Sequence, residues 1–309
     1  MIKPQAAPDA WLNNLHYLTT DETGPMHWLW GAFFEDTRAQ LIEQVGQWLC
    51  GDDFGHGPFN DLAHQLPQDW PKGNSKRYGR VAQGYFEASA LAVSNADGTE
   101  ALQAVNPFLQ RLDVRHPLTI ERVRVWPDKL QAEVESTCGE LELAFYDTGW
   151  MSHFHRYSTG RKLEFSLVGL AHSARKINEE SFVLTEPPWL DAVLKNDVEF
   201  AHEVNEQGQR TVTFHTKGMA ALLPHETQRC EYAFRGTVKA LNPLPDLFGQ
   251  PSWLAVVTVG RDIQYPSGEA DEFDMDIVVT RLVWGDGPPP LVGDDMEGNI
   301  WLQGCVTGL

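Results

Sequence analysis

The sequence predicts an α+β protein with a mainly antiparallel β interior, in which a helical N-terminal part precedes one or two small β-barrels. Three observations predict this class: an apolar pattern of helical period near the N-terminus, alternating apolar residues from about residue 118 onward, and turn residues between the alternating runs. Hydrophobic side chains make up 42% of the 309 residues, enough for packed cores. A chain of this length typically forms roughly two domains.

A helix is predicted within an N-terminal helix-containing region, residues 1–110. Thr37 with Gln40 three residues later has the pattern of a capping box, and Gly51 is a typical residue for the end of a helix. The apolar residues between them that follow one helix face are Leu41, Ile42, Val45, Trp48 and Leu49.

Two later stretches alternate with period two, as half-buried strands do. We predict a first β domain over residues 111–180, a mixed connecting segment over 181–229 with a hairpin turn at 205–208, and a second β domain over 230–309. The expected strands are residues 123–125, 130–134, 141–145, 163–167, 232–238, 253–259, 273–279 and 300–306.

The two β stretches share a short phrase in which a turn glycine lies three residues before an apolar strand residue. It reads Tyr157, Gly160, Leu163, Phe165 and Leu167 in the first stretch, and Pro290, Gly293, Met296, Gly298 and Ile300 in the second. The repeat indicates two related small barrels.

These phrases also resemble OB-like domains of uncharacterised bacterial proteins. The residues that resemble the last barrel strand are Pro290, Gly293, Asp294, Asp295, Gly298, Trp301, Leu302, Gln303 and Gly304. Those that resemble an upstream part of such a barrel are Leu141, Phe145, Asp147, Tyr157, Gly160, Phe165 and Leu167. The resemblance covers residues 118–177 and 230–306. It implies a fold, which often binds oligonucleotides or oligosaccharides, and no particular mechanism.

The charge of the chain argues against nucleic acid as the partner. The formal net charge is −19, and residues 262–297 contain ten acidic side chains and one arginine. Such a surface repels phosphate backbones and anionic lipid and attracts a cationic protein. We therefore expect a basic protein partner, no nucleic acid and no membrane; an immunity protein against a cationic toxin is one concrete form. Plain solubility charge is the alternative. The candidate partner-binding residues are Asp271, Glu272, Asp274, Asp276, Asp294, Asp295 and Glu297.

Motifs for catalysis are scarce, so we expect no enzyme and no cofactor. The glycine-rich nucleotide loops, H-E-x-x-H and G-x-S-x-G are all absent. A three-ligand metal site at Asp147, His153 and His155, in a metal-dependent hydrolase, is one alternative, because histidines two apart on a strand share a face. Two surface histidines in a loop are the other interpretation.

A small-molecule or oligosaccharide site is a further alternative. The tryptophans that could form a sugar platform, or else belong to the core, are Trp126, Trp150, Trp253, Trp284 and Trp301. The compartment is expected to be cytoplasmic, because the N-terminus lacks the apolar core of a secretory signal and four well-separated cysteines do not suggest a disulfide framework.

Overall fold

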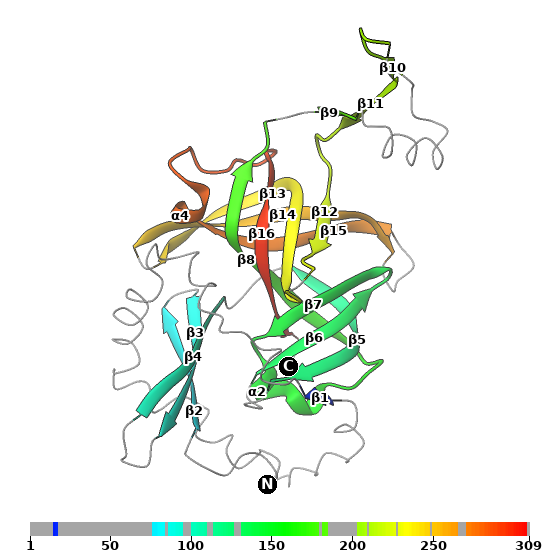
Figure 1. The fold of residues 1–309 in the computed structure, drawn as a ribbon. Coiled ribbons are helices and arrows are strands. Elements are labelled where there is room, and N and C mark those ends of the chain that lie inside the picture. Colours follow the sequence, from blue (N-terminus) through cyan, green and yellow to red (C-terminus); the bar gives the residue numbers. More distant parts are fainter. Residues whose placement is uncertain are drawn as a thin grey trace.

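The chain is mostly β-strand where its structure is described. The computed structural model describes residues 15–17, 76–83, 86–94, 100–109, 114–126, 131–178, 181–184, 203–208, 210–226, 228–247, 249–264 and 270–307. This confirms a β-rich protein (Figure 1). The predicted helix near residues 37–50 lies outside the described residues.

The described strands form one large sheet and two small ones. The ten strands of the main sheet are β1 (Leu15–Tyr17), β5 (Arg115–Val125), β6 (Ala132–Cys138), β7 (Leu141–Asp147), β8 (Lys162–Lys176), β12 (Ala221–Pro224), β13 (Glu231–Leu247), β14 (Gln250–Gln264), β15 (Ala270–Thr280) and β16 (Asp295–Val306). The small sheets contain β2 (Lys76–Gln83), β3 (Phe86–Ser94) and β4 (Glu100–Leu109), and β9 (Ser181–Leu184), β10 (Glu203–Val204) and β11 (Arg210–His215). The short helices are α2 (Trp150–His153), η6 (Phe154–Arg156) and α4 (Arg281–Trp284).

Two closed rings of five strands make up most of the main sheet, and they share two strands. The pairing of the first ring runs β5–β6–β7–β16–β8 and returns to β5; that of the second runs β13–β14–β15–β8–β16 and returns to β13. Each ring has one parallel pair, β7 with β16 in the first and β15 with β8 in the second. In Figure 1 the first ring lies below the second, and β8 and β16 run through both.

The shared strands serve the two rings with different parts of their length. Residues 162–166 of β8 pair with β5, whereas residues 168–170 pair with β15. In β16, residues 295–301 pair with β13, and residues 303–304 pair with β7. One end of each shared strand therefore completes the first ring, and the other end completes the second ring.

The rings are related by an approximate two-fold arrangement about the antiparallel pair β8–β16. At its centre Gly169 faces Leu302. The pairs on either side are Leu167 with Gly304 and Ala171 with Ile300. The offset in residue number between Gly160 and Gly293 also relates Leu167 to Ile300 and Ala171 to Gly304. The predicted repeat therefore matches the register of β8 against β16.

The turn glycines of the repeat occupy equivalent places. Gly160 and Gly293 have φ of +77° and +91°, a region that disfavours other residues. The Gly160 amide donates to the Ile120 carbonyl over 2.7 Å, and the Gly293 amide donates to the Val238 carbonyl over 2.8 Å. The register of β5 shifts directly after Ile120, and that of β13 directly after Val238. Both rings thus bend their first strand at the same point.

One continuous apolar core fills both rings. Trp150 of α2 and Phe154 of η6 pack into the first ring, where Trp150 stacks on Tyr157 with ring centroids 5.9 Å apart. Tyr157 also stacks on Phe165 of β8 at 6.1 Å. In the second ring α4 follows the third strand in the same way, and Val283 packs against the core. The short helices therefore have matching positions.

The predicted strands are confirmed, because every alternating run overlaps a strand of the structure. The hairpin is confirmed as well: β10 pairs with β11, and Gly208 between them has φ of +72°. The predicted division at residues 111–180, 181–229 and 230–309 stays a prediction. In the structure the two β stretches exchange strands, because β8 pairs with β15 and β16 pairs with β7.

Candidate functional site

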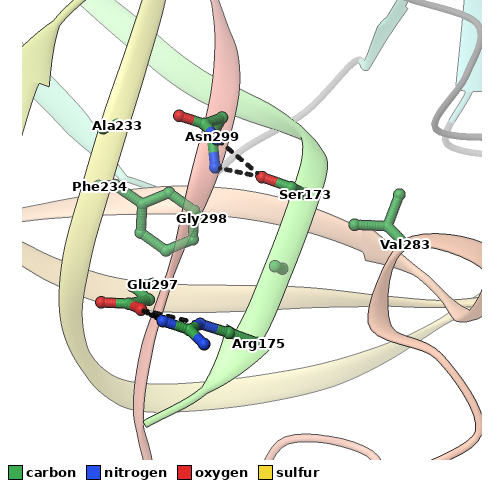
Figure 2. A pocket seen from close by; sticks show the side chains of 9 residues that line it. Ser173, Arg175, Ala233, Phe234, Val283, Glu297, Gly298 and Asn299 are labelled. Atoms are coloured by element: carbon green, nitrogen blue, oxygen red, sulfur yellow. Dashed lines mark hydrogen bonds and ion pairs between the residues drawn. The ribbon is translucent and has the colours of Figure 1, made fainter.

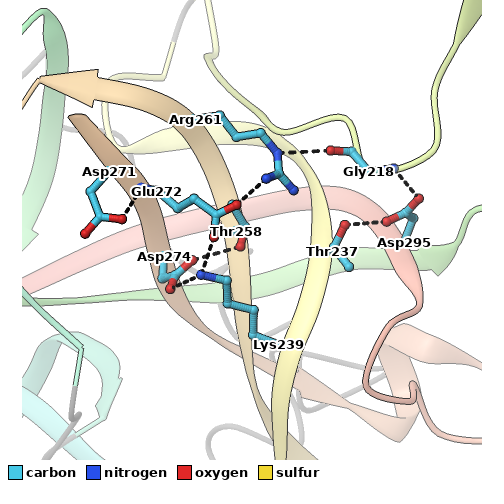
Figure 3. Close-up of polar contacts among 9 residues, drawn as sticks. All are labelled: Gly218, Thr237, Lys239, Thr258, Arg261, Asp271, Glu272, Asp274 and Asp295. Atoms are coloured by element: carbon cyan, nitrogen blue, oxygen red, sulfur yellow. Dashed lines mark hydrogen bonds and ion pairs between the residues drawn. The ribbon is translucent and has the colours of Figure 1, made fainter.

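The carboxylates on β15 lie beside basic side chains from β13 and β14. Lys239 contacts Glu272 at 2.6 Å and Asp274 at 2.7 Å (Figure 3). Arg261 forms an ion pair with the second oxygen of Glu272, and the Thr258 hydroxyl donates to Asp274 over 2.8 Å. The charges on this part of β15 are therefore largely balanced within the molecule.

The carboxylates at the start of β16 are also paired. Asp294 contacts Lys176 of β8 at 2.6 Å. Glu297 forms an ion pair with Arg175, and its other oxygen lies 3.7 Å from Arg235. Because β8 and β13 flank β16, the strand exchange itself brings these cations to the acidic strand.

The three remaining candidates differ in their surroundings. Asp295 accepts hydrogen bonds from the Thr237 hydroxyl at 2.6 Å and the Gly218 amide at 2.8 Å (Figure 3). Asp271 is exposed, whereas Asp276 is buried and accepts a bond from the amide of residue 114 at 3.4 Å. Four of the seven predicted partner-binding residues thus sit in ion pairs, and the partner-binding role of all seven stays a prediction.

A groove lies against the outer side of β5, β6 and β7. It has a volume of about 670 Å³, and its far wall comes from Pro224 of β12, His225, Arg229 and Tyr232 of β13. We call it the β7 groove. Its lining contains three carboxylates, those of Glu121, Glu135 and Glu142, against one guanidinium and one imidazole, those of Arg229 and His225. Glu135 is ion-paired with arginines outside this lining, so the exposed carboxylates of Glu121 and Glu142 are the ones that favour a cationic ligand.

The carboxylates of the groove differ in their exposure and in their contacts. Glu142 is exposed, and the exposed Glu121 accepts a bond from the Thr137 hydroxyl at 3.2 Å. Glu135 is held by Arg122 at 3.6 Å and by Arg124. Glu121 and Glu142 are therefore the carboxylates best placed to meet an incoming charge.

Two buried hydroxyl groups complete the lining. Tyr232 of β13 crosses to β7, where its hydroxyl accepts a hydrogen bond from the Ala144 amide at 2.6 Å and donates to the Ala144 carbonyl at 3.1 Å. Burial raises the pKa of Tyr232, so its phenol stays neutral. The Ser136 hydroxyl is buried and has no hydrogen-bond partner among the described residues. A buried hydroxyl of this kind is normally bonded.

A second cavity of about 420 Å³ lies between β8, β13, β16 and α4. Figure 2 shows that its polar side chains contact one another: Arg175 pairs with Glu297, and the Ser173 hydroxyl accepts bonds from the amide and side chain of Asn299 at 3.0 and 2.9 Å. These internal contacts make the cavity a poorer binding site than the β7 groove.

The predicted metal-binding residues do not form the expected arrangement. His153 ends α2 and His155 lies in η6, so the prediction that both occupy a strand is wrong. In a helix, side chains two residues apart diverge by about 200°. Asp147 and His153 both lie near Gly149, because a Cβ on Gly149 would be 3.0 Å from His153 Cδ2 and 3.4 Å from Asp147 Oδ1. His155 is exposed instead. Within the described chain no three His, Cys, Asp or Glu side chains are placed to hold a metal ion.

The tryptophans do not form an exposed platform in the described structure. Trp126, Trp150 and Trp301 are buried, as the core interpretation predicts. Trp253 is half-buried beneath the guanidinium of Arg281, 5.4 Å from the ring centroid. The two cavities above have no indole in their linings.

Comparison with protein-family models, curated proteins and solved structures finds no match to this chain. No helix among the described residues is long and apolar enough to cross a membrane.

The β7 groove is not predicted by the sequence pattern. Alternation in β6 indicates that Glu133 and Glu135 both face outward, and of the two only Glu135 belongs to the groove lining, because Glu133 is buried. The opposite wall contains Tyr232 and Arg229, which are far from β6 and β7 in the sequence. No local sequence pattern predicts that these residues face β6 and β7.

Proposed function

We propose that this is a non-enzymatic, cytoplasmic binding protein that takes a basic protein partner in the β7 groove. The observation that carries the proposal is the groove lining, in which the carboxylates of Glu121 and Glu142 are exposed while Glu135 is held by ion pairs. A cationic segment is attracted to such a lining, and the water-exposed position of Glu142 and Glu121 makes the attraction depend on salt.

We further infer that each ring is an OB-like barrel, which supports the location of the site. The first ring is a closed five-stranded circuit with a short helix after its third strand. OB folds bind their ligands on the face of the second and third strands, which are β6 and β7 here. The carboxylates on that face favour a basic polypeptide over a nucleic acid.

Neutralisation of a cationic toxin is the specific role that we propose for this binding. An acidic groove can occupy a surface that the toxin uses to hold phosphates. Co-expression with a basic nuclease toxin encoded beside this protein should restore growth if the proposal is right. Continued killing at matched expression would argue against this role.

Binding is tested by capture from a lysate of the native host in about 50 mM and about 500 mM salt, Debye lengths of roughly 14 and 4 Å. The groove variant is Glu121→Lys with Glu142→Lys; the control, Glu206→Lys with Asp286→Lys, makes the same charge change at exposed positions elsewhere. The proposal expects a basic protein that the wild type and the control retain at low salt and the groove variant loses. Equal capture by all three proteins would overturn it.

A further inference from the structure

The strand β7 has one paired edge and one partly open edge. It pairs with β6 over residues 141–146, from Leu141 opposite Cys138 to Tyr146 opposite Glu133. Its other edge meets β16 only at Tyr146 and Asp147. The described structure therefore places no strand beside residues 141–144 on that side.

The backbone groups at the open edge can be assigned from the Tyr232 contact. The amide and carbonyl of Ala144 both bond the Tyr232 hydroxyl, so they point away from β6. In an antiparallel ladder the backbone groups of residues two apart point to the same side. The amide and carbonyl of Glu142 therefore also face the open edge. Because the Tyr232 hydroxyl already occupies the Ala144 groups, the amide and carbonyl of Glu142 are the pair that can bond an added strand.

The open edge borders the β7 groove, since Glu142, Leu143 and Ala144 all belong to its lining. Four residues of strand span about 13 Å, enough for a short extended segment. The side chains at the edge select the chemistry of that segment. Glu142 is exposed beside the backbone groups, and Glu121 lies in the same lining.

We propose that an extended, lysine- or arginine-bearing segment of the partner adds to the open edge of β7 as a further strand. This inference rests on the proposed function and specifies how its site recognises a partner. Main-chain hydrogen bonds to Glu142 supply the alignment, and the carboxylates of Glu142 and Glu121 select basic side chains. The Tyr232 hydroxyl occupies the next bonding position at Ala144 and so limits the length of the added strand.

The test uses fluorescence anisotropy with the full chain and a labelled Lys-Val-Lys-Val-Lys-Val-Lys peptide. We expect it to bind at least tenfold more tightly than the matching Glu-Val peptide, and we expect the Glu121→Lys, Glu142→Lys variant to lose this preference. The Glu206→Lys, Asp286→Lys control should keep it.

Amide methylation separates strand addition from simple charge attraction. Only one edge of an added strand bonds to β7, so N-methylation of one alternate set of amides should weaken binding at least tenfold, while methylation of the other set leaves it unchanged. Tyr232→Phe should tighten binding at least threefold, because it releases the backbone of Ala144.

The experiments distinguish a failure of strand addition from a failure of the proposed function. If both methylated peptides bind like the parent and the groove variant still abolishes binding, strand addition is wrong and the acidic binding site stands. If the lysine and glutamate peptides bind equally, or the groove and control variants behave alike, the proposed function fails as well.

Discussion

In both rings a side chain from the other ring bonds the backbone at the edge of the third strand, but the side chains differ. In the first ring Tyr232, from the first strand of the second ring, bonds the backbone of Ala144 on β7. In the second ring His116, from the first strand of the first ring, donates through Nε2 to the Asp274 carbonyl on β15 at 2.8 Å. The same topology thus uses a phenol that stays neutral in one place and a group that can be protonated in the other.

The surroundings of the two contacts differ as well. His116 is 2% exposed and stacks on Phe273 with ring centroids 3.9 Å apart, so the edge of β15 is sealed there. The edge of β7 borders the groove instead. Similar folds therefore produce one closed edge and one open edge, and the open edge carries the proposed function.

The largest expected effect comes from a position where the repeat differs. Phe165 in the first ring corresponds to Gly298 in the second, and a Cβ on Gly298 would lie 2.0 Å from the Ser173 carbonyl oxygen. Gly298→Ala must push two backbones apart, and we expect a loss of about 3 kcal/mol in the free energy of unfolding. Urea denaturation measures it. Gly287→Ala, where no atom lies within 4 Å, is the control. Equal losses in the two variants would contradict the close strand approach.

The second effect concerns the pH dependence of the His116 contact. Burial lowers the pKa of His116 to about 4, against the raising influence of its hydrogen bond to the Asp274 backbone and of the Asp274 charge. Since the unfolded imidazole titrates near 6.5, the unfolded state binds more protons between pH 6.5 and pH 4. This group should therefore cost the fold about 3 kcal/mol as the pH falls through that window, and nothing above it.

Urea denaturation at pH 7.0, 5.5 and 4.5 checks this dependence against His116→Phe. The variant keeps a ring to stack on Phe273 but does not titrate, so its stability should fall less steeply on acidification. Other groups titrate in both proteins, and the difference between the two curves isolates His116. Parallel curves would show that His116 is not the group responsible.

Much of the strand content follows from local pattern, whereas the pairing does not. Period-two alternation is enough to find β6 or β15, because each strand has one buried face. The exchange of β8 and β16 depends on contacts between residues more than a hundred positions apart, and the Gly160 and Gly293 phrases indicate only that two units are related. The ion pair of Lys239 with Asp274 joins residues 35 positions apart, which local pattern does not reveal, so the acidic segment appeared freer in the sequence than in the fold.

The local prediction failed for His153 and His155 for a different reason. A short segment between two strands carries no extended periodicity, so a turn of helix and a strand end look alike in sequence. Trp150 and Phe154 are four positions apart and both buried, and a helical turn places such residues on one face, toward the core.

A smaller effect is expected at the Tyr232 contact. Tyr232→Phe leaves the amide and carbonyl of Ala144 without their partner, which should lower the free energy of unfolding by about 1–2 kcal/mol. Because burial raises the pKa of Tyr232, the loss should be the same at pH 5 and pH 8. Denaturation at these two values measures it. A pH-dependent loss would contradict the neutral contact that distinguishes this ring from the other.

The smallest effects test whether the two turn glycines are equivalent. Gly160 and Gly293 have positive φ, and a Cβ at either position would meet no atom within 4 Å, so Gly160→Ala and Gly293→Ala introduce backbone strain without a clash. Each should lower the free energy of unfolding by about 1 kcal/mol, and the double variant by about 2 kcal/mol, because the sites share no partner. Matched single losses in thermal or urea denaturation would support one turn used twice. A loss confined to one glycine would mean that the rings share a strand order while their turns are stabilised differently.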